Sequence, residues 1–158
     1  MGMYTELVLG IKLKLQEHEN YVLDILKYMC GDVEELTVPE DKLTHPLFET
    51  ERWRFMFRCG SYYFDGQTNS FVTEDDIGCK FLTVRCNLKN YNSEIEEFLD
   101  WIVKYTDYFG EFVGYMRYEE DDLPTLIYFN RDDVKYGYPT EITLYKFDKA
   151  IGTLPINM

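Results

Sequence analysis

The residues from Thr5 to Leu15 alternate with a period of two. Leucine and isoleucine residues fall on one side, namely Leu7, Leu9, Ile11, Leu13 and Leu15, and the other side carries Glu6, Val8, Gly10, Lys12 and Lys14. A period of two residues is that of a β-strand with one face in a hydrophobic core. Because that face needs another layer to cover it, the chain is constrained from its start to a layered fold that contains a sheet.

Two segments have the period of a helix. In the first, around residues 18 to 30, Gly31 stands where a left-handed C-terminal cap belongs. In the second, Ser93 and Glu96 have the spacing of a capping box at the helix start, and Gly110 marks its end. The apolar residues of the two segments recur at the spacing of a buried helical stripe, at Val22, Ile25, Leu26 and Met29 and at Ile95, Phe98, Leu99 and Ile102.

Further strands are predicted between and after the helices. They cover residues 51–59, 61–64, 80–88, 112–118, 125–130 and 142–147. The resulting order, β-α-β-β-β-α-β-β, predicts an α+β fold. We expect a mostly antiparallel sheet of about five to six strands with two helices on one face, ferredoxin-like in its core order. Residues 3–130 are predicted to form this single domain, and residues 131–158 a C-terminal extension with an added strand and an irregular tail.

The charge of the chain is concentrated in one segment. Residues 91–122 carry ten of the 29 acidic residues and two of the 16 basic ones, which is −8 of the net −13. Aromatic residues are interleaved with these acids. Such a distribution repels nucleic acid and favours basic protein surfaces, so we expect no nucleic-acid partner.

No catalytic motif accompanies this charge. The sequence has no nucleotide-binding glycine cluster, no nucleophile elbow and no zinc-protease motif, and only two histidines, His18 and His45. The four cysteines, at positions 30, 59, 79 and 86, lack the close ligand pairs of a zinc site. We therefore expect a non-enzymatic protein without catalytic residues, metal or cofactor.

The chain gives no sign of targeting to a membrane. Its first residues have neither a basic region nor an apolar stretch, so no signal peptide is expected. No apolar run approaches the ~20 residues that span a bilayer. We expect a cytoplasmic protein with no membrane partner.

Several segments together resemble a group of small uncharacterised acidic proteins of bacteria and their phages or prophages. The segments are Tyr4–Gly10, Ser61–Phe64, Asn87–Tyr91, Glu94–Ile102 and Tyr118–Thr125. These are parts of strands and helices and contain no catalytic signature. The resemblance implies a mobile-element context and no particular activity.

The main functional expectation is an acidic protein-interaction domain, phage or prophage encoded, that binds a basic host protein. The candidate partner-binding face consists of Glu94, Glu96, Glu97, Asp100, Glu119, Glu120, Asp121 and Asp122. One alternative is an immunity protein that masks a cationic toxin. A second is a small-ligand or metal-binding module whose candidate pocket is formed by Trp53, Tyr62, Tyr63 and Tyr115. The third is a structural homodimer that pairs exposed aromatic strands.

Overall fold

The computed structural model describes residues 3–58 and 70–156. Six strands form one antiparallel sheet in the order β2-β3-β1-β4-β5-β6. The α+β class and the antiparallel sheet expected from the sequence are thereby confirmed. The strands are β1 (Thr5–Leu13), β2 (Phe71–Glu74), β3 (Lys80–Leu88), β4 (Phe109–Tyr118), β5 (Thr125–Asn130) and β6 (Asp133–Gly137).

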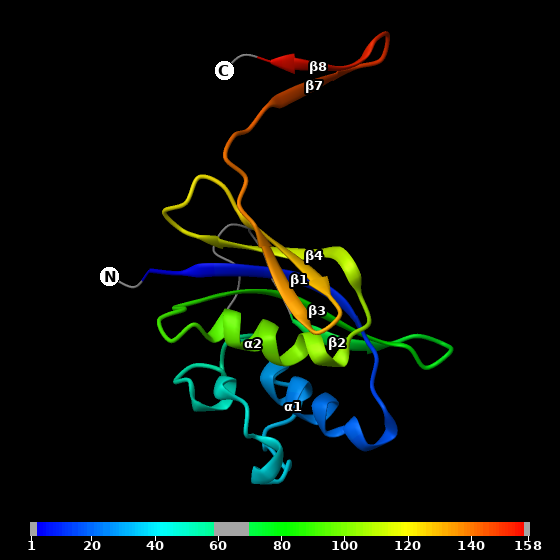
Figure 1. The fold of residues 1–158 in the computed structure, drawn as a ribbon, viewed down its shortest axis with the longest axis vertical. Coiled ribbons are helices and arrows are strands. Elements are labelled where there is room, and N and C mark those ends of the chain that lie inside the picture. The colour runs from blue at the N-terminus through cyan, green and yellow to red at the C-terminus, as the bar shows by residue number, and fades with distance from the viewer. Residues whose placement is uncertain (1–2, 59–69, 157–158) are drawn as a thin grey trace.

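Two helices, α1 (Tyr21–Cys30) and α2 (Glu94–Ile102), lie below the sheet in Figure 1. Short 3-10 turns supplement them, at Glu17–Glu19, Glu40–Lys42, Pro46–Glu49 and Val103–Tyr105. Both predicted helices are confirmed, and Gly31 caps α1 with a left-handed φ of 83°. Among the described residues, no helix combines the length and the apolar character that crossing a membrane requires.

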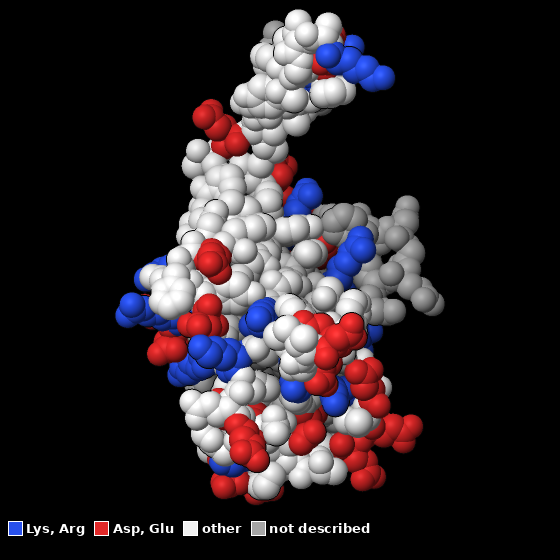
Figure 2. Space-filling model, turned by 90° about the vertical axis from the view of Figure 1, so that its right-hand side faces the viewer, with Lys and Arg blue, Asp and Glu red and all other residues white. Residues whose placement is uncertain are grey.

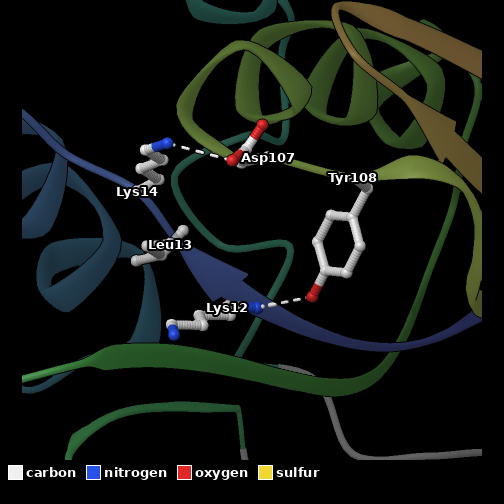
Figure 3. A pocket seen from close by; sticks show the side chains of 5 residues that line it. All are labelled: Lys12, Leu13, Lys14, Asp107 and Tyr108. Atoms are coloured by element: carbon white, nitrogen blue, oxygen red, sulfur yellow. Dashed lines mark hydrogen bonds and ion pairs between the residues drawn. The ribbon is translucent and has the colours of Figure 1, made fainter.

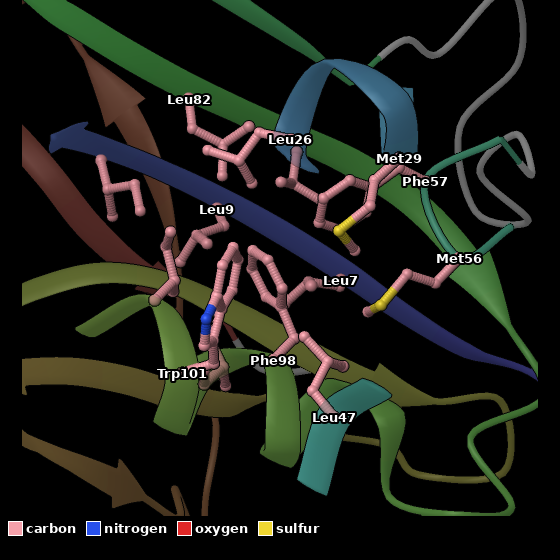
Figure 4. Packing of buried hydrophobic residues seen from close by; sticks show 14 of the residues in the cluster. Leu7, Leu9, Leu26, Met29, Leu47, Met56, Phe57, Leu82, Phe98 and Trp101 are labelled. Atoms are coloured by element: carbon pink, nitrogen blue, oxygen red, sulfur yellow. The ribbon is translucent and has the colours of Figure 1, made fainter. Parts of the chain in front are cut away.

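The hydrophobic core lies between the sheet and the helices. Leu7, Leu9 and Ile11 of β1 are buried, as the alternation predicts. Their partners across the β1–β3 ladder, such as Val84 opposite Leu9, are also buried. Phe98 of α2 points toward these strand residues in Figure 4. Burial of this one continuous cluster is the main stabilising term for the domain.

The central strands approach each other closely at Gly114. A Cβ placed on Gly114 of β4 would clash with the carbonyl oxygen of Val8 and would lie 2.9 Å from Leu9 Cα. Leu9 and Gly114 are partners in the β1–β4 ladder. The absence of a side chain at this position therefore sets how β4 packs against β1.

The prediction of a strand over residues 51–59 is wrong for residues 51–58, and residue 59 lies outside the described residues. Successive turns occupy this stretch, with hydrogen bonds from Phe55 N to Arg52 O and from Arg58 N to Phe55 O. Trp53, Met56 and Phe57 are buried, whereas Phe55 is 55% exposed. The buried residues are thus three and four positions apart, which is the spacing of helical turns. The alternation of aromatic residues suggested a strand, but the chain does not form one here.

The start of α2 also differs from the expected capping box. Ser93 has a left-handed φ of 58° and no side-chain capping bond. Asn90 takes that role, because its Oδ1 accepts a hydrogen bond from Ile95 N at 2.8 Å and its Nδ2 donates to Glu96 at 2.8 Å. The helix ends at Ile102, eight residues before Gly110, which instead lies within β4. Asn90 thus provides the capping group from outside the expected sequence spacing.

The order of strands differs in detail from the expected one. Between α1 and α2, the described residues form two strands, β2 and β3, and the predicted strand 61–64 lies outside the described residues. The sheet continues past residue 130, since β6 joins it beside β5.

The end of the chain forms a hairpin of its own. Its strands are β7 (Leu144–Asp148) and β8 (Gly152–Ile156), which make a separate two-stranded sheet. Figure 1 shows this hairpin standing clear of the other elements. We call residues 138–156 the arm, and the part of the chain from β1 to β6 the body.

Candidate functional site: an acidic hollow at the end of the sheet

A hollow of about 340 Å³ lies where the start of β1 meets the end of β4. We call it the acidic hollow. Its residues come from β1, β4, β5 and the segments beside them, and from the start of α2. They are Met3, Thr5, Asn90, Tyr91, Glu96, Met116, Tyr118, Asp121 and Thr125.

The register of the sheet brings these distant segments together. Thr5 of β1 is the ladder partner of Tyr118 in β4, and Glu119 N donates to Tyr4 O at 3.0 Å. A tight turn then follows, with a bond of 2.9 Å from Asp121 N to Tyr118 O. The turn between β4 and β5 is thereby placed next to the loop that precedes α2.

Two carboxylates and two phenol rings define the chemistry of the acidic hollow. Glu96 of α2 and Asp121 of the β4–β5 turn both line it, together with Tyr91 and Tyr118. Partial burial, followed by the carboxylates of the neighbouring turn, raises the pKa of Tyr118. Carboxylates attract a cation, and aromatic rings bind one through their faces. This set of groups fits a lysine or arginine side chain.

The outer face of α2 continues the negative surface beyond the acidic hollow. Glu97 and Asp100 lie near Tyr136 of β6, whose pKa is raised first by burial and then by Glu96, Tyr138, Asp100 and Glu97. We call Asp121, Glu96, Glu97 and Asp100 the acidic surface. Its members come from two elements that the sequence separates.

His45 adjoins this surface and forms a potential ligand group with it. Ligand atoms of His45, Glu97 and Asp100 all lie within 4.8 Å of one another. However, His45 Nδ1 accepts the Leu47 N–H at 3.0 Å, which places the ring hydrogen on Nε2. Nε2 then donates to Asp100 at 2.8 Å, so neither ring nitrogen presents a lone pair to a metal ion. The arrangement fixes the loop against α2.

Glu94 does not belong to the exposed surface on which the sequence placed it. It is fully buried, and its carboxylate accepts hydrogen bonds from Arg52 N at 3.1 Å and from Asn92 N at 2.8 Å. A carboxylate that accepts two backbone N–H groups ties loops together. Glu120 and Asp122, by contrast, are exposed at the turn, and Glu119 is half-buried beside them.

The ligand pocket predicted from the sequence is not assembled by the described residues. Trp53 is 2% exposed and packs on Phe48 with the ring centroids 4.9 Å apart, within the core below the sheet. Tyr115 is the ladder partner of Val8, on the face of the sheet that points away from the helices. Tyr62 and Tyr63 lie outside the described residues.

A buried carboxylate on that opposite face was not singled out by the sequence analysis. Glu6 is 1% exposed and lies between Asn87 of β3 and Arg117 of β4 in the two ladders. The pKa of Tyr115 is raised, first by burial and then by the charge of Glu6. An acid at an outward position of a central strand, with arginines on the flanking strands, is the signal that would have indicated this polar group.

A second hollow of about 330 Å³ lies beside the end of β1. Lys14 pairs with Asp107 at 2.9 Å, and the Lys12 N–H donates to Tyr108 Oη at 2.8 Å (Figure 3). The charges of that pair compensate each other locally. Of these two hollows, the acidic hollow carries the net negative charge.

Comparison of the chain with protein-family models, with curated proteins and with solved structures gives no match.

Proposed function

We propose that this chain is a non-enzymatic protein-interaction domain whose acidic surface binds a basic surface of another protein. The observation that carries the proposal is the meeting of Glu96 and Asp121 in one hollow with Tyr91 and Tyr118. A lysine or arginine of the partner would enter this hollow. Glu97 and Asp100 would attract the basic residues around it.

The electrostatics of the whole chain favour the same class of partner. A net charge of −13 produces a field that accelerates encounter with a basic protein and repels nucleic acid. Within the acidic surface, Asp100 is exposed and Glu96 and Glu97 are half-buried. Partly buried carboxylates are screened less by salt than exposed ones, which adds to the affinity they can supply.

The mobile-element context that the resemblance implies is compatible with two kinds of basic partner. A phage or prophage protein would use the surface on a basic host protein, and an immunity protein would use it on a cationic toxin. Both alternatives place the same residues at the contact, and we favour the first. A toxin gene adjacent to this one would favour the second.

We also propose that the core of the body is ferredoxin-like. Across the sheet, the order β4-β1-β3-β2 supports this, as do the positions of α1 between β1 and β2 and of α2 between β3 and β4. The strands β5 and β6 then extend this core at the β4 edge.

A basic peptide provides a direct test of the acidic surface. We expect a hexalysine peptide to bind the full chain at low salt, as measured by calorimetry, and to bind more weakly as salt is added. The double variant Glu96→Gln/Asp121→Asn should weaken this binding roughly fivefold to tenfold, because it removes both carboxylates of the hollow.

The matched control removes the same charge elsewhere. The double variant Glu34→Gln/Glu35→Gln neutralises two exposed acids that follow α1. We expect it to weaken the binding by less than twofold, by its effect on net charge alone. Equal losses in the two double variants would show that only net charge matters, and would refute a specific site at the acidic hollow.

A further inference from the structure

The arm presents apolar side chains to solvent along its whole length. Tyr138, Tyr145 and Phe147 are 71%, 59% and 69% exposed. Five aliphatic residues add to this surface, namely Ile142, Leu144, Ile151, Leu154 and Ile156. Every residue of β8 is exposed, and so is every residue of β7 except Asp148. Exposed apolar side chains in this number on one segment of a globular protein mark an interaction site.

The register of the hairpin places apolar residues on both of its faces. Leu144 is opposite Ile156 on one face, and Tyr145 is opposite Pro155 on the other. A two-stranded hairpin in water is at best marginally stable by itself. The arm therefore needs another surface to cover it.

The exposed apolar area of the arm is divided between its two faces. At about 180 Å² for a fully exposed side chain of this size, the exposed fractions correspond to roughly 800 Å² over both faces together. Each partner in an interface of standard size contributes about 800 Å². One face of one arm therefore supplies only part of such an interface, and a stable dimer needs the contact to be made twice.

The charge distribution indicates which part of the chain another copy can accept. The arm contains Glu141, Asp148, Lys146 and Lys149, and therefore has no net charge. The rest of the chain carries the full −13. Figure 2 shows the arm as a mostly white projection above a body with many red side chains. Two bodies of this charge repel each other, whereas the neutral arm approaches a second body without that repulsion.

A complementary apolar surface exists on the body. Phe109 and Phe112 of β4 are 63% and 55% exposed. The ring of Phe112 packs edge-to-face on Tyr128 of β5, with the centroids 5.7 Å apart. Tyr128 alternates along β5 with the buried Ile127 and Phe129, so this ring pair lies on the face opposite the helices. We call Phe112 and Tyr128 the ring pair.

We propose that the arm binds the ring pair of a second copy of this chain, and that two chains exchange arms in a closed dimer. In this contact, the face of the arm with Tyr145, Phe147 and Pro155 packs on Phe112 and Tyr128 of the other chain. Both the arm and its acceptor occur on one chain, so a two-fold axis makes each contact twice.

The hairpin also disfavours growth of the sheet at one of its edges. Pro155 is the fourth of the five residues of β8 and has no N–H to donate. A proline is accommodated in a ladder where its nitrogen faces away from the neighbouring strand. The outer edge of β8 therefore lacks the donor at Pro155, which disfavours pairing of a further strand there.

Sedimentation equilibrium of the full chain tests the proposal. We expect a mass near twice 18.9 kDa for the unmodified chain at about 100 µM. Phe147→Asp should raise the dissociation constant about 30-fold or more, because it places a charge in the centre of the contact. The matched control is Ile77→Asp, which makes the same kind of change at a residue of the body that is 85% exposed. This control should leave the dimer unchanged.

A mixing experiment distinguishes arm exchange from other contacts. Phe112→Asp alters the acceptor and leaves the arm intact, whereas Phe147→Asp does the reverse. Each variant alone should be monomeric, and an equal mixture should form a dimer through the one remaining intact contact. Circular dichroism would verify that both variants are folded, as expected for changes at exposed side chains.

Three results would overturn the proposal. The first is a monomer at about 100 µM for the unmodified chain, which would mean that the arm folds back or serves a different protein. The second is a dimer that resists Phe147→Asp or Phe112→Asp. The third is a mixture of the two variants that remains monomeric.

Discussion

The body and the arm both contain strands with apolar side chains but bury those side chains very differently. In the body, Leu7 and Leu9 of β1 are at most 2% exposed, because α1 and α2 cover their face of the sheet. In the arm, Phe147 of β7 is 69% exposed. Alternation alone therefore does not determine burial, since a strand is buried only where a second layer is available.

The two regions also differ in where their stability comes from. The body has a continuous core of aromatic and aliphatic side chains, including edge-to-face contacts such as Phe57 on Phe98 with the centroids 4.8 Å apart. The arm has the pairing of β7 with β8. We therefore expect global unfolding to depend on the body and association to depend on the arm.

The largest expected effect compares one phenylalanine from each region. Phe98→Ala should lower the free energy of unfolding by about 3–5 kcal/mol, because it leaves a cavity in the core. Phe147→Ala should change it by at most about 0.5 kcal/mol when the protein is dilute enough to be monomeric. Urea unfolding followed by tryptophan fluorescence measures both, since Trp53 and Trp101 belong to the body. Similar losses in the two variants would refute the distinction.

A smaller effect is expected from adding a methyl group at glycines of the two regions. Gly114→Ala should cost about 1–3 kcal/mol, because the new Cβ would clash with the β1 backbone at Val8. A Cβ added at Gly152 in the arm meets no atom within 4 Å, but the residue has a φ of 84°. Gly152→Ala should therefore strain only the hairpin, by about 1 kcal/mol. The same fluorescence assay should therefore detect the first change and not the second.

Gly10→Ala is the control for this comparison. Gly10 lies in β1 on the face opposite the helices and has no atom within 4 Å of an added Cβ. We expect its free energy of unfolding to stay within about 0.5 kcal/mol of the unmodified chain. A loss as large as that of Gly114→Ala would contradict the assignment of the clash to Gly114.

The smallest expected effect is a loss of stability of the body at alkaline pH. Burial, followed by the charge of Asp32, raises the pKa of Cys30 from 9.0 to about 12. Burial also raises the pKa of Tyr105 and Tyr136. A group whose pKa is higher in the folded than in the unfolded state contributes its full stabilisation at any pH below its unfolded-state pKa. This contribution is lost as the pH rises through the folded-state pKa.

Thermal unfolding between pH 8 and pH 11 measures this contribution. We expect the Tm to decrease above about pH 9, where the unfolded thiol begins to ionise. Cys30→Ser should make the decrease smaller. A Tm that stays constant across this range would contradict the raised pKa values.

The acidic surface shows how far the sequence could predict a site. The excess of acids between residues 91 and 122 is visible in the sequence, and Glu96, Glu97, Asp100 and Asp121 of that set lie on the acidic surface. The burial of Glu94 could not be predicted, because its partners Arg52 and Asn92 come from a turn and a loop. Net charge is additive along a chain, whereas the burial of this carboxylate depends in part on the backbone of Arg52, which is 42 residues away in sequence.

The two errors in the predicted elements have different origins. Residues 51–58 alternate like a strand, yet packing against α2 and the 3-10 turn at Pro46–Glu49 selects a series of turns. There, tertiary contacts outweigh a local preference of about 1 kcal/mol or less. Ser93 and Glu96 have the spacing of a capping box, yet the side chain of Asn90, another local residue, caps the helix in place of Ser93.

The sequence by itself determined the strands Lys80–Leu88 and Thr125–Asn130, most of β1, the apolar stripes of α1 and α2, and the net charge. These follow from side-chain direction within a single element, which the period of the sequence encodes. The tertiary structure decided the order of strands, the meeting of Glu96 with Asp121, and the exposure of the arm. These depend on which distant elements pack together, and a local period carries no information about that choice.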